Sequence, residues 1–241
     1  RAGPSTGMPT KQEAADLLLA MYGRHGESPA PIIAPRTPAE CFHAAIEAAR
    51  IALKYRTPVF ILSDTFLANS SEPWKVPDVN DLPDISVAFA TAPNHEGEFW
   101  PYVRDENLAR PWAVPGTPGL EHRVGGLEKQ DGTGNVSYDP QNHEYMSRIR
   151  AAKVAKIADD IPALEVDDPS GEADLLVISW GSTFGAIRAG CEKVRAQGEI
   201  NLGQLVKILR AEYLVDAKSY NKIQGHPFRA SEIETEILKR L

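Results

Sequence analysis

The sequence predicts an α/β fold built on a parallel sheet, and two observations support this. An apolar segment at residues 31–34, a helical pattern at 37–55 and a continuous apolar run at 57–63 follow one another, which is the order of a βαβ unit. A further apolar segment at 173–180 leads through a short turn into another helical pattern. Continuous apolar runs are typical of parallel strands, because helices cover both faces of such sheets.

The elements of the N-terminal part follow from apolar spacing and capping patterns. Residues 11–22 repeat apolar side chains at helical spacing, and Thr10 with Glu13 forms a capping-box pattern at the start of this helix. Thr37 is predicted to cap the helix that runs to about Tyr55. The apolar face of that second helix is predicted to consist of Cys41, Ala45, Ala48, Ala49 and Ala52.

The composition changes at Glu72. From there to residue 138 the chain is rich in Pro, Gly and Asn, with scattered aromatic residues that distinguish it from a flexible Gly/Ser linker. We expect an arm packed over other surfaces, with turns at 115–119 and 125–135 that join short strands. A charged helix at 142–160 is predicted to connect two domains.

The C-terminal part is predicted to be a second, smaller α/β domain. The strand at 173–180 is followed by a tight turn, GST, and by helices at 184–197 and 201–213. Ser231 and Glu234 form a capping-box pattern for a final helix that ends at Leu241. The predicted division of the chain is residues 1–74, 75–160 and 161–241.

One connection does not fit a parallel sheet. Only residues 198–200 join two predicted helices, although successive crossover helices need a strand between them. The two helices form a hairpin, or a strand is missing from the sequence. We expect a chain break between Ile200 and Asn201, and a missing region before Arg1.

Composition excludes several classes of protein. A net charge of -7 and a pI of about 5.4 argue against a nucleic-acid-binding or anionic-membrane surface, and no apolar run approaches the ~20 residues of a membrane span. Cys41 and Cys191 lie far apart and form neither a metal motif nor a disulfide scaffold. We therefore expect a protein of the reducing cytoplasm that does not itself ligate iron or another soft metal.

Six segments in order along the chain carry a resemblance to a known family. They are RAGPSTGMPTKQEAADLLLAMYGRHGE, YRTPVFILSD, LANSSEPW, PGTPGLEHRVGGLEKQDGTGNVSYDP, WGSTFGAI and NLGQL. Together they resemble the 2-oxoacid:ferredoxin oxidoreductases, and most of all the large (alpha) subunit of the 2-oxoglutarate:ferredoxin type. The resemblance covers nearly the whole chain, and the order of the segments is more specific than any one of them.

The resemblance implies a fold and points to missing parts. Residues 1–74 would be the latter part of a thiamine-diphosphate-type, pyrimidine-binding domain, and residues 161–241 a domain of the transketolase C-terminal type. The family also has an upstream domain, a Tyr-Pro-Ile-Thr-Pro motif beside the thiamine ring, and a further stretch between the equivalents of Ile200 and Asn201. This sequence contains none of these.

The implied activity is the oxidative decarboxylation of 2-oxoglutarate to succinyl-CoA with coenzyme A, with electrons passed to ferredoxin. In this family a smaller beta subunit carries the iron–sulfur cluster and shares thiamine diphosphate and Mg with the large subunit, typically as an alpha2beta2 assembly. The cofactor performs the difficult chemistry and the protein orients the substrate. Two alternatives stay open: a pyruvate- or branched-chain-specific homologue, and a non-catalytic scaffold whose Pro-rich arm clamps a partner.

The resemblance places substrate recognition in the opening loop. Arg1 and Thr10 match the family positions that hold the substrate carboxylate, for which the planar fork of Arg is well suited. Between them Ser5, Thr6 and Gly7 offer hydroxyls and close backbone approach. The alternative interpretation is that Arg1 is a solvated chain end and Thr10 only a helix cap.

Other residues are candidates for coenzyme A or active-site contacts. Those that match the family segments are Ser182, Thr183, His122, Asn201 and Gln204. Each also has an ordinary structural explanation, since hydroxyl and amide side chains commonly cap helices and a loop histidine is often at the surface. Asp64 ends a predicted strand, where α/β folds place site residues.

Overall fold

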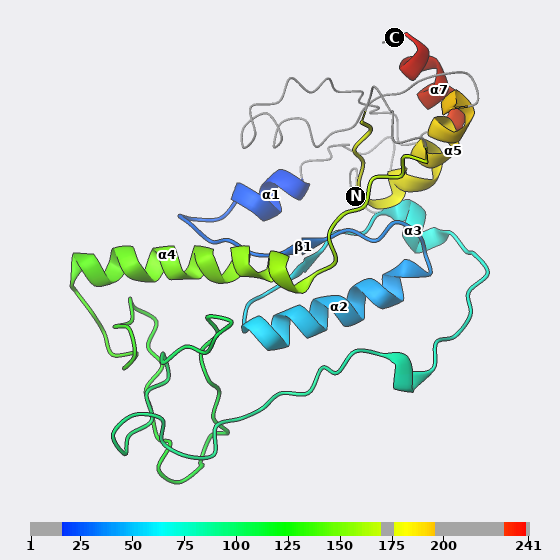
Figure 1. The fold of residues 1–241 in the computed structure, drawn as a ribbon. Coiled ribbons are helices and arrows are strands. Elements are labelled where there is room, and N and C mark those ends of the chain that lie inside the picture. Colours follow the sequence, from blue (N-terminus) through cyan, green and yellow to red (C-terminus); the bar gives the residue numbers. More distant parts are fainter. Residues whose placement is uncertain (1–15, 170–175, 196–228, 240–241) are drawn as a thin grey trace.

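The computed structural model describes residues 16–169, 176–195 and 229–239 of the chain (Figure 1). Its elements, in order, are α1 (Asp16–Tyr22), β1 (Ile32–Ile33), α2 (Glu40–Tyr55), β2 (Phe60–Ile61), α3 (Thr65–Asn69), η1 (Val79–Asp81), α4 (Pro140–Lys156), η2 (Ile157–Asp160), η3 (Gly181–Thr183), α5 (Phe184–Arg195) and α7 (Ala230–Leu238). β1 and β2 pair in parallel, with Ile32 opposite Phe60, and α2 forms the crossover between them. The predicted βαβ unit is therefore confirmed.

The buried face of α2 differs from the predicted one. The side chains that the fold buries are Ala44, Ala48, Ile51 and Tyr55, and of the predicted apolar face only Ala48 is among them. Ala45 is exposed. Ile51 and Tyr55 pack with Ile157 of η2, so the position of η2 selects which side of the helix turns inward. The predicted face, which consists of small residues, is therefore rotated around the helix axis relative to the buried face.

The start of α2 is capped by one local and one distant residue. The Thr37 hydroxyl accepts a hydrogen bond from the Glu40 amide at 3.3 Å, as predicted from the local pattern. The Glu72 carboxylate accepts from the Ala39 amide at 2.7 Å. A carboxylate is stabilised at this end of a helix by the partial positive charge of the free amides. This second contact ties the beginning of the Pro/Gly-rich arm to the βαβ unit.

β2 is less buried than its apolar run predicts. Ile61 is 43% exposed and Phe60 is only partly covered. Among the described residues the sheet consists of β1 and β2 alone. The prediction of a buried strand is therefore wrong for this part of the chain, because packed helices cover the faces of a parallel sheet and the face that carries Ile61 stays largely exposed.

An ion cluster joins the C-terminal half of α2 to η2. Asp160 accepts from Arg50 Nη1 and from Lys54 Nζ, each at 2.7 Å, and its side chain is 22% exposed. Burial opposes ionisation of Asp160, but the hydrogen bonds from Lys54 and Arg50 outweigh it and hold the pKa of this carboxyl below its usual value. Burial and the same carboxylate raise the pKa of Tyr55 to about 12.

The predicted arm contains a packed lobe, defined here as residues 88–138. In Figure 1 the chain leaves α3, passes η1, runs beneath α2 and folds into this lobe below the start of α4. Isolated bridges such as Tyr102 to Gly132 and Lys129 to Val136 hold its loops together. Gly134 has φ +72°, and a Cβ there would lie 2.7 Å from the Tyr102 ring. The lobe therefore packs its backbone directly against its aromatic rings.

α4 carries the lobe on one side and continues into η2. It begins at Pro140, two residues before the predicted start, and Asp139 caps it by accepting from the Gln141 amide at 3.0 Å. Asn142 accepts from the Asp131 amide at 2.9 Å and donates to the Lys129 carbonyl at 2.8 Å. These paired bonds fix the 128–136 loop on the first turn of the helix.

The C-terminal described segments form a helix pair. α5 and α7 share a core made of Ile187, Cys191, Val194, Ile233 and Ile237. Residues 176–180 form no strand, so the prediction of a strand there is wrong for its described part. The N-cap of α7 is Arg229, whose amide donates to Glu232 at 2.9 Å. Ser231 and Glu234 are therefore not the capping pair.

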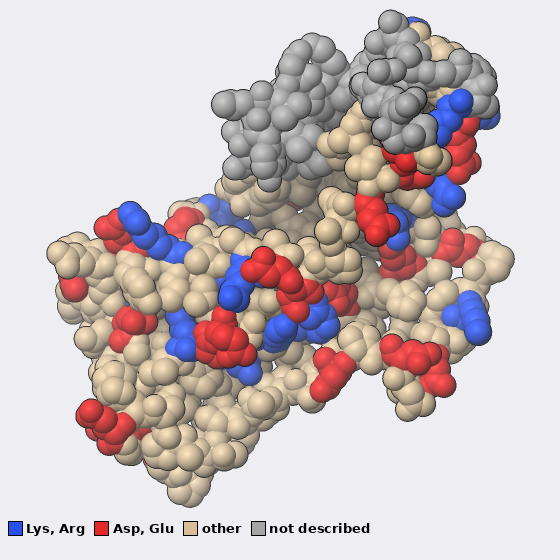
Figure 2. Space-filling model, viewed as in Figure 1, with Lys and Arg blue, Asp and Glu red and all other residues tan. Residues whose placement is uncertain are grey.

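Several expectations fall on residues that the structure does not describe. They concern the capping box of Thr10 and Glu13, the helix at 201–213 and the break between Ile200 and Asn201. None of the helices in the described ranges has the length and apolar character needed to cross a membrane. On the face shown in Figure 2, acidic and basic side chains are interspersed.

We predict opposite effects for two glycines of α5. At Gly190 a Cβ would lie 2.8 Å from Ile233 Cγ2, and Ile233 is a stiff, buried side chain. Gly190→Ala should therefore destabilise the intact protein by about 1–3 kcal/mol despite its better helix propensity. At Gly185 nothing lies within 4 Å of the added Cβ, so Gly185→Ala should be neutral or stabilise by up to ~1 kcal/mol. Urea unfolding measures both, and equal effects would contradict the α5–α7 contact.

A second prediction concerns Asp160. Asp160→Asn should destabilise the protein by about 1–3 kcal/mol at pH 7, because Arg50 and Lys54 lose their charged partner. The folded pKa lies below the unfolded value of about 3.9, so this stabilisation is present above that pH and disappears as the pH falls through the folded pKa.

Denaturant unfolding of wild type and variant at pH 7 and near pH 3 measures this difference. Glu144→Gln, which breaks an exposed pair with Arg148 on α4, is the control and should change stability by less than ~1 kcal/mol. A difference that grows toward low pH would contradict the assignment.

Candidate functional site

The predicted site residues fall into three groups in the structure. The predicted substrate residues Arg1, Ser5, Thr6, Gly7 and Thr10, together with Asn201 and Gln204, lie outside the described residues. Ser182 and Thr183 lie in η3, directly before α5, and His122 lies in the lobe. The described geometry therefore bears on two places, the carboxyl edge of the β1–β2 pair and the lobe.

Asp64 and Ser182 meet at the carboxyl edge of the sheet. Asp64 lies three residues after the end of β2 and caps α3, since its Oδ1 accepts from the Leu67 amide at 3.0 Å. Its Oδ2 accepts a hydrogen bond from the Ser182 hydroxyl. The contact joins residues 118 positions apart in the sequence. It brings the GST turn to the edge where α/β folds place their ligands.

The GST turn is shaped by its glycine and its threonine. Gly181 has φ +60°, a left-handed conformation that favours glycine. An added Cβ there would lie 3.7 Å from the Ala34 side chain, so the turn sits directly beside the loop that follows β1. The Thr183 hydroxyl donates to the Trp180 carbonyl at 2.7 Å. Both hydroxyl protons of the turn are thus used within the protein, while their oxygen lone pairs can still accept.

An arginine lies beside this edge. Arg36 forms a close ion pair with Glu40 at 2.5 Å and places its guanidinium 4.9 Å from the centre of the Phe184 ring. Burial opposes the ionisation of Glu40, but hydrogen bonds from Arg36 outweigh it and lower the pKa of the carboxyl. Arg36 therefore links the loop after β1 to the first residue of α5.

His122 is not part of this edge. Its Nδ1 lies 2.7 Å from the Leu120 carbonyl, and its ring contacts Phe99 edge-on at 4.9 Å between centroids. In Figure 1 the lobe lies below α2, whereas α5 begins on the other side of α2, beside α3. Within this chain the structure therefore does not bring His122 together with Ser182 and Thr183, and an active-site role for His122 stays a prediction.

Neither cysteine forms a disulfide. Cys41 lies on α2 and Cys191 is buried on α5, and both are free. Burial, supported by the nearby Asp64 carboxylate, raises the pKa of the Cys41 thiol, and burial also raises that of Cys191. Both thiols are therefore protonated at neutral pH and are weak nucleophiles.

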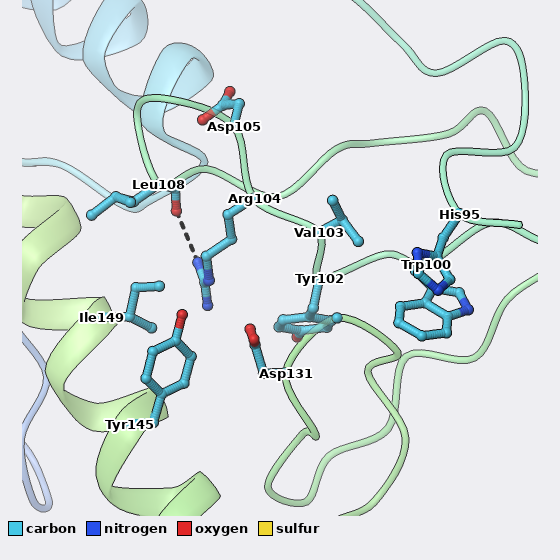
Figure 3. A pocket seen from close by; sticks show the side chains of 11 residues that line it. His95, Trp100, Tyr102, Val103, Arg104, Asp105, Leu108, Asp131, Tyr145 and Ile149 are labelled. Atoms are coloured by element: carbon cyan, nitrogen blue, oxygen red, sulfur yellow. Dashed lines mark hydrogen bonds between the residues drawn. The ribbon is translucent and has the colours of Figure 1, made fainter.

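The lobe and α4 line an open cavity of about 430 Å³ that the sequence patterns did not predict. We call it the lobe cavity; its principal lining residues are Trp100, Tyr102, Arg104, Asp131, Tyr145 and Ile149. In Figure 3 the side chains of Arg104, Asp131 and Tyr145 converge from three directions. The sequence feature that could have indicated this cavity is the presence of arginine and aromatic residues within a Pro/Gly-rich segment. Whether these side chains come together depends on how the lobe folds.

We predict that the Ser182 hydroxyl and Asp64 stabilise the fold jointly. In a double-mutant cycle of Ser182→Ala and Asp64→Ala, the coupling energy should be about 1 kcal/mol or more, because the bond involves a charged acceptor. Thermal or urea unfolding of the intact protein measures it. Thr183→Val paired with Asp64→Ala is the control and should show little coupling, since Thr183 donates to Trp180 instead. Absence of coupling for Ser182 would favour a hydroxyl that faces a ligand.

Comparisons with known proteins give the relatives of the chain. Residues 1–139 match the family described as pyruvate flavodoxin/ferredoxin oxidoreductase, thiamine diphosphate-binding. The 2-oxoglutarate oxidoreductase subunit KorA of Mycobacterium tuberculosis is 50% identical over 97% of this chain and 40% of its own length. The 2-oxoacid:ferredoxin oxidoreductase 1 subunit alpha of Aeropyrum pernix is 32% identical over 82% of this chain and 31% of its own length.

A solved structure extends the likeness to the fold. The 2-oxoglutarate:ferredoxin oxidoreductase from Magnetococcus marinus, with 2-oxoglutarate, coenzyme A and succinyl-CoA bound, matches with a TM-score of 0.84 and 32% identity. The match covers 100% of this chain and 47% of that chain. The present chain thus spans less than half the length of these relatives.

The alignment with the Mycobacterium tuberculosis subunit runs over 266 residues, more than the 241 of this chain. It therefore includes positions of the relative that have no counterpart here. A family match over more than half of the chain, together with these relatives, decides the assignment. The chain belongs to the thiamine diphosphate-binding family of pyruvate flavodoxin/ferredoxin oxidoreductases.

Proposed function

We propose that the chain is part of the alpha subunit of a 2-oxoglutarate:ferredoxin oxidoreductase. The enzyme would oxidatively decarboxylate 2-oxoglutarate to succinyl-CoA with coenzyme A and pass the electrons to ferredoxin. The observation that carries the proposal is the 50% identity to a 2-oxoglutarate oxidoreductase subunit across nearly the whole chain. The fold match to a 2-oxoglutarate:ferredoxin oxidoreductase supports it independently.

The contribution of this chain is recognition of the substrate carboxylate. Arg1 would hold the carboxylate with two parallel charge-assisted hydrogen bonds, and Thr10 would add a hydroxyl at the start of a helix. Ser5, Thr6 and Gly7 between them would supply hydroxyl and backbone N–H groups. Ser182 and Thr183 are the described candidates for coenzyme A contacts, through the lone pairs that their internal hydrogen bonds leave free.

The described residues do not fit the metal-bound part of the cofactor. No group of three or more His, Cys, Asp or Glu side chains in the described ranges is arranged to hold a metal ion. At the carboxyl edge of the sheet, Asp64 already accepts from the Leu67 amide and from Ser182. We therefore propose that a smaller beta subunit holds the iron–sulfur cluster and supplies most contacts to the diphosphate and Mg, which the two subunits share. The edge described here would support the shared site.

The proposal includes an assembly and a location. We expect an alpha2beta2 complex in the cytoplasm that passes electrons to ferredoxin, with no nucleic acid or membrane as partner. Residues 1–74 would be part of the pyrimidine-type thiamine-binding domain, residues 75–160 the arm with its connecting helix, and residues 161–241 a domain of transketolase C-terminal type. The names of the relatives as alpha subunits support a partner subunit.

Two alternatives make different predictions. A pyruvate- or branched-chain-specific homologue is compatible with relatives whose names specify only a 2-oxoacid. A non-catalytic scaffold would place Arg1 and Thr10 far from any thiamine in the assembled complex. Methyl viologen reduction by the two-subunit complex, with several 2-oxoacids and with or without coenzyme A, distinguishes all three.

We predict that Arg1→Ala raises the KM for 2-oxoglutarate about 10- to 100-fold, the cost of a lost charge-assisted contact. The KM for coenzyme A should change less than about twofold, because Arg1 is proposed to contact only the 2-oxoacid. A uniform loss of activity would not raise one KM selectively. Arg148→Ala, on the exposed side of α4, is the matched control and should leave both values unchanged. An unaltered KM for 2-oxoglutarate in Arg1→Ala would reject the carboxylate role.

A further inference from the structure

The lobe cavity contains a cation whose bonding capacity is only partly used. Arg104 Nη1 donates to the Leu108 carbonyl at 2.9 Å. Its Nε is buried without a hydrogen-bond partner among the described residues. Within those ranges no carboxylate lies in ion-pair distance of Arg104, and in Figure 3 the guanidinium points toward Tyr145 and Asp131. A buried donor without an acceptor costs free energy, so the fold holds Arg104 at this position against a penalty.

Two further cations raise the local positive potential. The Tyr102 ring lies near two guanidinium groups, with Arg104 at 5.8 Å and Arg110 at 5.5 Å from its centre. Lys153 lies one helical turn after Ile149 on α4 and donates to the Arg56 carbonyl at 3.2 Å. Burial and the repulsion of Arg104 and Arg110 lower the pKa of Lys153 to about 8. In the described structure neither Arg110 nor Lys153 has an ion-pair partner.

In the described ranges the neighbouring acids form no ion pair with these three cations. The Asp105 carboxylate accepts from the amides of Asn107 and Ala109, both at 2.9 Å, and so closes its own loop. Glu128 and Glu27 pair with Arg150 instead. Asp131 is the remaining carboxylate that lines the cavity beside Arg104. An excess of positive charge at this point is notable in a chain whose net charge is -7.

The aromatic walls add a second requirement on the ligand. The rings of His95 and Trp100 stack with centroids 3.5 Å apart and line the cavity together with Tyr102. Flat aromatic surfaces bind heterocyclic bases by stacking, whereas Arg binds phosphate oxygens through its planar fork. A volume of about 430 Å³ lies within the usual range of small-molecule sites.

We propose that the lobe cavity binds a nucleotide, with Arg104 on a phosphate group and the His95–Trp100 and Tyr102 rings against the base. The Tyr145 hydroxyl donates a hydrogen bond to the same phosphate, and Asp131 accepts one from a ligand hydroxyl or amino group. Arg110 and Lys153 act at longer range by attracting the anion. The nucleotide half of coenzyme A and a free nucleotide share this chemistry.

The experiment measures nucleotide binding by calorimetry to the intact two-subunit complex, with AMP, adenosine 3′,5′-bisphosphate, adenosine and inorganic phosphate as probes. AMP and the bisphosphate should bind more tightly than adenosine or phosphate alone. Arg104→Gln should weaken AMP binding about tenfold or more, as expected for loss of a charge-assisted bond. Tyr145→Phe, which removes only a hydroxyl, should weaken it less.

Arg148→Gln is the matched control, because Arg148 lies on α4 but is 79% exposed and pairs with Glu144. Its AMP affinity should equal that of the wild type. Competition identifies the source of the nucleotide. If coenzyme A displaces AMP and Arg104→Gln raises the KM for coenzyme A, the site holds the coenzyme; if AMP binds equally well with saturating coenzyme A, it holds a free nucleotide.

Two results would overturn the proposal. One is absence of AMP and bisphosphate binding to the wild type, or equal AMP affinity in the wild type and Arg104→Gln. The other is loss of subunit assembly in Arg104→Gln and Lys153→Gln with AMP affinity unchanged, which would show that the cations bind an acidic segment of the partner. The AMP-binding measurements need no turnover, so their result is independent of the activity proposed above; only the KM for coenzyme A depends on that activity.

Discussion

The C-terminal turn of α2 joins three separate parts of the chain. Lys54 pairs with Asp160 of η2, and Tyr55 is buried against Ile157. Arg56 follows in a left-handed conformation with φ 51°. From there its guanidinium donates to the Arg110 carbonyl at 3.0 Å and lies 4.6 Å from the centre of the Trp112 ring. Three consecutive residues thus position η2 and the lobe relative to the βαβ unit.

This arrangement also explains why cations gather near the lobe cavity. The carbonyl of Arg56 accepts from Lys153 on α4, so the end of α2 holds the side of α4 that faces the lobe. The lobe places Arg104 and Arg110 in the same region, where both guanidinium groups lie near the Tyr102 ring. Burial lowers the pKa of Arg104 and of Arg56. Burial of these positive charges costs stability, and groups with perturbed pKa values are common at functional sites.

The carboxyl edge of the sheet is organised differently. There the polar groups satisfy one another, since Asp64 accepts from both Leu67 and Ser182 and Arg36 pairs with Glu40. Such a saturated network holds the loops after β1 and β2 against the start of α5. If the opening loop of the chain binds the substrate as proposed, this edge supports the site by keeping its neighbours rigid.

Local patterns were sufficient for the order and type of most elements. The βαβ unit, the GST turn, α5 and the connecting helix all follow from apolar periodicity and capping residues, because those signals depend on neighbours within a few positions. The family resemblance also lies in the sequence, and the comparisons confirm it. The carboxylate-binding loop was read from the same resemblance and stays a prediction.

Contacts between distant segments determined the rest. Periodicity could not show that Ile51 and Tyr55, rather than Ala45 and Ala49, turn inward, because the partner Ile157 lies about a hundred residues away in the sequence. The same holds for the Glu72 contact at the start of α2, for the Asp64–Ser182 bond and for the lobe cavity. Each depends on packing that brings remote residues together, and a local sequence pattern contains no record of which remote residues will meet.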